Sequence, residues 1–127
     1  MFCYQCEQTS RSAGCTDIGV CGKDEETAIL QDLLFHATKG VAQYAHRAAE
    51  RGARDREADR FILKSLFLTV TNVNFDSAAI ERAIREAGVV RDRAKALYVS
   101  RANGHSNGVR GPATWVPAGD RNGLLGT

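Results

Sequence analysis

Four cysteines near the amino end are the residues of this chain whose type and spacing are best suited to chemistry. Cys3, Cys6, Cys15 and Cys21 lie within MFCYQCEQTSRSAGCTDIGVCGKD, and the rest of the 127-residue chain contains no cysteine. Thiolates bind soft metals and iron–sulfur clusters, and thiols also pair as disulfides. The block Cys-x2-Cys-x8-Cys-x5-Cys therefore predicts a metal or cluster site, or a pair of disulfides.

Several interpretations of these thiols compete. Disulfides are disfavoured, because the start of the chain lacks the charged and apolar regions of a signal peptide and nothing else suggests secretion. Structural zinc also takes four thiolates, but zinc sites usually pair two Cys-x2-Cys knuckles, whereas five residues separate the second pair here. A remnant with reduced, idle cysteines is a further possibility. An iron–sulfur cluster is the favoured interpretation.

The spacing suits a cubane that presents its irons at the corners of a tetrahedron. The two-residue gap lets Cys3 and Cys6 reach neighbouring corners, and the longer loops then carry Cys15 and Cys21 to the others. Gly14 precedes Cys15, while Gly19 and Gly22 flank Cys21. Glycine lets the backbone approach closely and point N–H groups at sulfur, which tunes the reduction potential.

The elements that must position these cysteines are predicted to be helices. Residues 1–23 are expected to form an irregular cluster-binding loop, and 24–100 a three-helix bundle, so the fold class is all-α. Apolar residues at three- and four-residue spacing predict helices from Asp24 to about Gly52, from Asp55 to about Asn72, and from Asp76 to about Ser100. Their apolar faces are expected to include Leu30, Leu34, Val41 and Tyr44 in the first helix, Ala58, Phe61, Ile62, Leu66, Thr69 and Val70 in the second, and Ile80, Ile84, Ala94 and Tyr98 in the third.

Two glycine features bear on packing. Gly40 lies inside the first predicted helix, where it costs ~1 kcal/mol relative to alanine, so we expect another element to pack closely against it. Residues 101–127 hold six of the twelve glycines and both prolines. Because few apolar residues anchor this segment, we expect a Gly-rich tail or connector that is partly disordered.

Composition excludes several functions. A net charge of +2, only 7% aromatic residues and no long basic run give nucleic-acid binding little support. No apolar stretch approaches the ~18 residues of a membrane span, so we expect a cytoplasmic protein without membrane contact.

Lys23 and Lys39 are expected to be solvated, although either could stabilise a negatively charged cluster. Phe2 and Tyr4 are expected either to shield a cluster from water or to pack on the first helix.

Longer stretches carry a family likeness. MFCYQCEQT, GCTDIGVCGK and ETAILQDLL, followed by KGVAQYAHRA, DRFILKSLFLTVTNVNFD and ATWVPA, resemble the N-terminus of the hybrid cluster proteins, also called prismane proteins or hydroxylamine reductases. The likeness covers nearly the whole chain. The cysteine spacing resembles the subgroup with a [4Fe-4S] cluster, whereas a subgroup with wider gaps carries a [2Fe-2S] cluster. A more distant likeness is to nickel-containing carbon monoxide dehydrogenases, which share a helical domain.

This resemblance implies that Cys3, Cys6, Cys15 and Cys21 bind a [4Fe-4S] cluster that relays electrons. It places the reduction of hydroxylamine to ammonia at a second, hybrid iron–sulfur–oxygen cluster, held by Cys, His and Glu residues of later domains. No cysteine follows Cys21, so the hybrid cluster is not expected here and the chain alone is predicted to be inactive. We expect that the chain is a truncated product or a proteolytic fragment. A naturally split subunit is a less simple explanation. The expected partners are a redox donor protein or the remaining domains.

Overall fold

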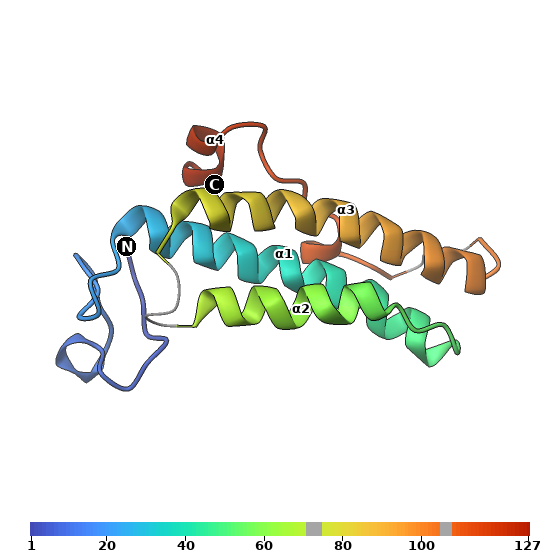
Figure 1. Ribbon diagram of the computed structural model, residues 1–127, viewed down its shortest axis with the longest axis horizontal. Coiled ribbons are helices and arrows are strands. Elements are labelled where there is room, and N and C mark those ends of the chain that lie inside the picture. Colours follow the sequence, from blue (N-terminus) through green and yellow to red (C-terminus); the bar gives the residue numbers. More distant parts are fainter. Residues whose placement is uncertain (71–74, 105–107) are drawn as a thin grey trace.

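The computed structural model describes residues 1–70, 75–104 and 108–127, and three long helices dominate it (Figure 1). They are α1 (Glu25–Glu50), α2 (Arg56–Thr69) and α3 (Ser77–Arg101). Three short helical segments complete the described elements: η1 (Ser10–Ser12), η2 (Gly111–Ala113) and α4 (Arg121–Leu125). The described residues form no strand beyond an isolated bridge near the amino end. The all-α prediction is therefore confirmed.

An aspartate begins each long helix, as the sequence predicts. The Asp24 carboxylate accepts a hydrogen bond from the backbone N–H of Thr27 at 2.8 Å. Asp55 and Asp76 each accept two N–H groups in the first turn of α2 and α3. These contacts satisfy N–H groups that have no partner within the helix. The helix ends are less predictable: α2 ends at Thr69, before the expected limit at Asn72, which lies outside the described residues.

The core lies where α1 meets α2 and α3 (Figure 1). Most of the apolar side chains expected on α1 and α3 are buried, with Leu30, Leu34, Val41, Ile80 and Ile84 at 0% exposure. A second cluster at the far end of the bundle packs Tyr44 against Tyr98, with 6.2 Å between the ring centroids. Leu30 and Leu34 of the main core lie near the start of α1, and the cysteine loop of residues 1–23 leads directly into that start.

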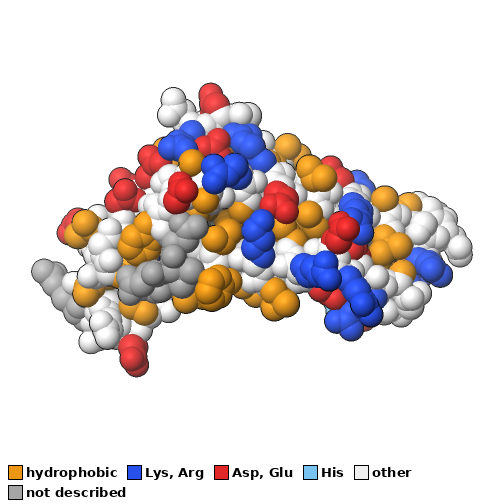
Figure 2. All heavy atoms as spheres, in the orientation of Figure 1, with side chains coloured by type: hydrophobic (Ala, Val, Ile, Leu, Met, Phe, Trp, Pro, Cys, Tyr) orange, Lys and Arg blue, Asp and Glu red, His pale blue; other side chains and the backbone are white. Residues whose placement is uncertain are grey.

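The predicted apolar face of α2 is partly wrong. Leu66 is 39% exposed and Val70 is 50% exposed, whereas Ser65 is buried. Leu63 and Phe67 are also exposed, and Figure 2 shows hydrophobic side chains gathered along this outer side of α2. The segment from Phe61 to Val70 is apolar on several sides, so spacing alone could not select the buried side. Among the described residues, no helix combines the length and apolar character that a membrane span requires.

The carboxyl-terminal segment, which we expected to be a partly disordered tail, packs on the helices where the structure describes it. Leu124 of α4 is fully buried in the main core, and Trp115 packs against the same core. The ring of Trp115 meets His36 of α1 edge-on, with 5.5 Å between the centroids. Arg91 of α3 also donates a hydrogen bond to the Trp115 carbonyl. The described part of residues 101–127 therefore covers one side of the α1–α3 pair.

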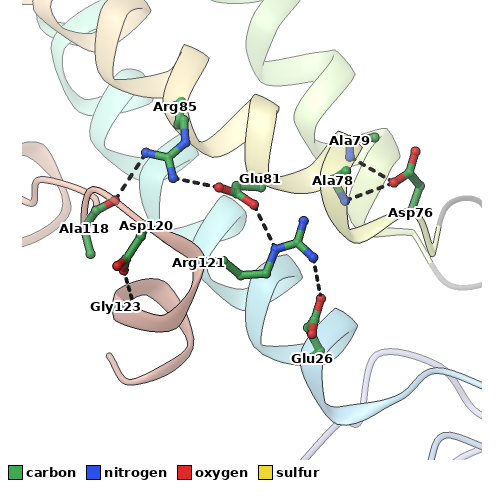
Figure 3. Close-up of polar contacts among 10 residues, drawn as sticks. All are labelled: Glu26, Asp76, Ala78, Ala79, Glu81, Arg85, Ala118, Asp120, Arg121 and Gly123. Atoms are coloured by element: carbon green, nitrogen blue, oxygen red, sulfur yellow. Dashed lines mark hydrogen bonds and ion pairs between the residues drawn. The ribbon is translucent and has the colours of Figure 1, made fainter.

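An ion-pair network fixes α4 to the bundle (Figure 3). Arg121 donates to Glu81 of α3 at 2.9 Å and to Glu26 of α1 at 3.2 Å. Arg85 donates to the other Glu81 oxygen at 2.7 Å and to the Ala118 carbonyl at 3.3 Å. Glu81 thus bridges two guanidinium groups, and these hydrogen bonds hold its pKa below the usual range against the opposing effect of desolvation. The network joins residues 95 positions apart in sequence.

Candidate metal centre

The cysteine loop lies at the end of the bundle where α1 begins, α2 ends and α3 begins (Figure 1). Its first and third cysteines are paired in an isolated antiparallel bridge. The N–H of Cys3 donates to the carbonyl of Cys15 at 3.0 Å, and the N–H of Cys15 donates to the carbonyl of Cys3 at 2.8 Å. This pairing brings the two halves of the motif side by side, although they are separated in sequence.

Cys15 is the most enclosed of the four cysteines, with 5% of its surface exposed. The backbone N–H of Ser10 donates to its sulfur, with a nitrogen–sulfur distance of 3.5 Å. The pKa of the Cys15 thiol lies below its usual value because the backbone N–H groups of Ser10 and Val20 stabilise the thiolate, with a further contribution from the charge of Lys23, and burial opposes them. A thiolate is the form that binds metals, so this environment favours a ligand role for Cys15.

Lys23 is buried, and the expectation of a solvated lysine is wrong at this position. Only 1% of its surface is exposed. Its ammonium nitrogen lies 3.6 Å from the Cys3 sulfur and 2.9 Å from the Gln5 side-chain oxygen. Lys39, by contrast, is exposed and lies over the ring of Phe35, 4.6 Å from the centroid. No sequence pattern distinguishes the two lysines, because burial of Lys23 depends on how the loop folds back.

Cys21 lies in a tight turn that Gly19 makes possible. The N–H of Gly19 donates to the Lys23 carbonyl at 2.7 Å, and that of Gly22 donates to the Gly19 carbonyl at 2.8 Å. A β-carbon at Gly19 would lie 3.1 Å from the Cys21 sulfur and 3.0 Å from the Lys23 β-carbon. The close approach of backbone to sulfur expected here is therefore present.

Aromatic side chains flank the loop. Phe2 packs on Gly14, where a β-carbon would lie 2.3 Å from the Phe2 ring, and its ring centroid lies 5.4 Å from that of Tyr4. Tyr4 is 72% exposed. Together with Phe35 of α1 these rings line a groove that also borders Cys3. Phe2 thus covers the backbone beside Cys15, whereas Tyr4 leaves most of its ring in solvent.

All four proposed ligands lie in the loop of residues 1–23. All four are free, and each belongs to the described part of the chain. Cys3 lies 3.6 Å from the Lys23 nitrogen, Cys21 lies against Gly19, and Cys6 is half-buried in the segment of residues 5–8. Among the described residues, no three His, Cys, Asp or Glu side chains come close enough to hold one metal ion. A cubane differs from a lone ion because each cysteine binds a separate iron, so its thiolates stand farther apart. The ligand role of the four cysteines stays a prediction.

Comparison with known proteins identifies the family. The model of the Prismane/CO dehydrogenase family matches residues 1–110. The chain belongs to this family. Hydroxylamine reductase of Rhodospirillum rubrum is 48% identical over 100% of this chain, and hydroxylamine reductase of Burkholderia ambifaria is 52% identical over 98% of it. The chain spans 24% of the length of each of these relatives, so it corresponds to one part of such a Prismane-family protein. The family resemblance seen in the sequence is confirmed.

Proposed function

We propose that residues 1–23 bind one [4Fe-4S] cluster through Cys3, Cys6, Cys15 and Cys21, and that this site relays single electrons toward a hydroxylamine-reducing centre. The observation that carries the proposal is the antiparallel pairing of Cys3 with Cys15, because it joins the two halves of the motif in one place. Four thiolates are the ligand set of a [4Fe-4S] cluster, which supplies one-electron transfer when bound. The family and its hydroxylamine reductase relatives support the redox assignment.

The residues of the chain contribute more than the four sulfurs. The N–H groups of Ser10 and Val20 stabilise the Cys15 thiolate, and hydrogen bonds to a ligand sulfur raise the potential of a bound cluster. The ring of Phe2 packs on Gly14, the residue before Cys15. Because a ligand role requires reduced thiols, we propose a reducing compartment, the cytoplasm, as the place of action.

Metal analysis of an anoxic preparation tests the cluster proposal. We expect a brown protein that absorbs near ~400 nm and holds about four irons per chain. A colourless protein with one zinc would favour the alternative, a structural zinc site formed by the four cysteines without a redox role. A sample with neither metal would mean that the four cysteines are reduced and bind no metal.

Substitution Cys15→Ser should remove the iron. Ser12→Ala is the matched control, because Ser12 also lies in the loop but is not a proposed ligand.

We also propose that the hydroxylamine-reducing centre lies in polypeptide beyond this chain. The four cysteines of the sequence are all assigned to the relay site, which leaves none for a second cluster. The isolated chain, loaded with iron, should therefore show no reduction of hydroxylamine above a protein-free control. Turnover by the isolated chain would contradict this assignment.

The proposed partner is that remaining polypeptide, and the outer side of α2 is its proposed contact. Leu63 is 69% exposed and Phe67 is 64% exposed on this helix, whose end lies beside the cysteine loop (Figures 1 and 2). The relatives have about three quarters of their length beyond the matched part, enough chain to cover this surface.

A binding assay in trans tests the contact. The chain should bind the part of the Rhodospirillum rubrum relative that follows its matched segment, and Leu63→Lys with Phe67→Lys should abolish that binding. Val89→Lys, on the exposed side of α3, is the control. Self-association of the chain, or binding only to a redox donor protein, would contradict the proposed partner.

A further inference from the structure

The Lys23 side chain is a buried positive charge for which the described residues provide no carboxylate partner. Only 1% of its surface is exposed, and no ion pair joins it to an aspartate or a glutamate of the described chain. A buried ammonium group is costly unless hydrogen bonds and negative charge compensate it. The surroundings of Lys23 must therefore supply that compensation.

The neutral part of the compensation comes from Gln5. An ammonium group has three donors, and one of them reaches the Gln5 side-chain oxygen at 2.9 Å. Asp32 lies near enough for the charge of Lys23 to act on it, but desolvation dominates and raises the pKa of this carboxyl. Asp32 is also exposed at the surface. Neither residue supplies a buried negative charge.

The group in contact with Lys23 that can carry a buried negative charge is a cysteine thiolate. The Lys23 nitrogen lies 3.6 Å from the Cys3 sulfur, and its positive charge also reaches Cys15. Its β-carbon and the Cys21 sulfur both lie against Gly19. The Lys23 side chain therefore runs from beside the turn that holds Cys21 to the sulfur of Cys3.

We propose that Lys23 is the buried counter-charge of the cysteine site, a positioning residue that holds the thiolates together and raises the reduction potential of the cluster they bind. The inference rests on the proposed cluster. Each thiolate carries one negative charge, and one electron taken from a reductant such as dithionite adds another to the site. A fixed positive charge in a water-excluded place stabilises the reduced form more than the oxidised form, because the attraction grows with each added negative charge.

Potentiometry on matched variants tests this role. Lys23→Met removes the charge at similar volume, and Lys39→Met makes the same change on the exposed side of α1, in a residue outside the site. In iron-reconstituted protein we expect Lys23→Met to make reduction at least tenfold less favourable, which is a fall of about 59 mV in the midpoint potential. The effect should persist at high salt, since a buried charge is screened little. Equal shifts in the two variants, or a rise in Lys23→Met, would overturn the proposal.

Lys23→Arg covers the case in which Lys23→Met cannot hold a cluster. If the charge matters, Lys23→Arg should keep iron that Lys23→Met loses, with circular dichroism showing the same helix content in both. Loss of iron from both variants would mean that the shape of lysine matters and its charge does not, which overturns the proposal. A wild-type protein that takes up no iron would overturn the cluster proposal and this inference together. An iron-loaded wild type whose potential matches that of Lys23→Met overturns this inference alone.

Discussion

Gly40 of α1 faces the carbonyl oxygen of Pro112 so closely that a β-carbon at position 40 would lie 2.4 Å from that oxygen. The contact joins the middle of the longest helix to η2, far away in sequence, and it explains why a helix interior contains glycine. It confirms the close packing expected at this position. The obstacle is backbone, which cannot rotate aside as a flexible side chain can.

Gly40→Ala should destabilise the protein although alanine is the better helix former. The gain of ~1 kcal/mol in helix propensity is outweighed by displacement of η2, so we expect a net loss of about 1–3 kcal/mol in the free energy of unfolding. Gly88→Ala in α3 is the matched control, because nothing lies within 4 Å of its added β-carbon. That variant should gain about 1 kcal/mol. Urea unfolding of both variants measures the contrast, and two changes of the same sign would refute it.

Leu124→Ala should show that the carboxyl-terminal segment contributes to the core. Leu124 is fully buried among α1 and α3 side chains, so its truncation should cost about 2–5 kcal/mol. Val116, in the same segment, is 70% exposed, and Val116→Ala should change stability by less than about 0.5 kcal/mol. Thermal unfolding followed by circular dichroism measures both. A small effect at Leu124 would mean that the segment detaches in solution.

These elements differ in how far the sequence alone could predict them. Local signals predicted the helix starts, because an aspartate needs only the next two or three N–H groups to act as a cap. The packing of the carboxyl-terminal segment could not be predicted in this way. It depends on contacts such as Arg121 with Glu26, whose partners are remote in sequence and have no local signature.

The candidate site also combines features that the local sequence predicts with features that depend on the fold. Cysteine type and spacing were sufficient to propose the ligands, and glycine was sufficient to expect close backbone at Gly19. The buried position of Lys23 was not predictable, since a lysine after a Cys-Gly pair gives no periodic pattern that signals burial. The exposed side of α2 escaped prediction for a related reason. The apolar residues of α2, including Leu66 and Phe67, lie on more than one face of the helix, so their spacing does not indicate which face is buried.

Acid should weaken the attachment of α4 through Glu81. Its pKa is lowered in the folded protein, first by the hydrogen bond from Arg85 and then by that from Arg121. A carboxyl group with a lowered folded pKa stabilises the fold fully above its unfolded pKa, about 4.3, and this contribution is lost as the pH falls through the folded value. Unfolding free energies measured by urea from pH 7 to pH 3 should therefore fall more steeply below about pH 4.3 in wild type than in Glu81→Gln.

The control for this prediction is Glu86→Gln, whose partner Lys64 lies at 3.3 Å in an exposed ion pair. Such surface pairs contribute little, so this variant should follow the wild-type curve closely. If Glu81→Gln and wild type show the same pH dependence, the two guanidinium contacts drawn in Figure 3 do not hold in solution.

Cys6 gives the sharpest test of the ligand set, because the structure ties it to the site least. It lies half-buried in the turn after Cys3, whereas Cys3 and Cys15 are held by mutual backbone hydrogen bonds. If the cluster needs four thiolates, Cys6→Ser should lose iron as completely as Cys15→Ser, although backbone hydrogen bonds preorganise the thiolate of Cys15. Iron per chain and absorbance near ~400 nm after anoxic reconstitution measure the loss. Full iron retention in Cys6→Ser would show that a different residue, or a solvent ligand, completes the site, and it would leave Cys3, Cys15 and Cys21 as the supported ligands.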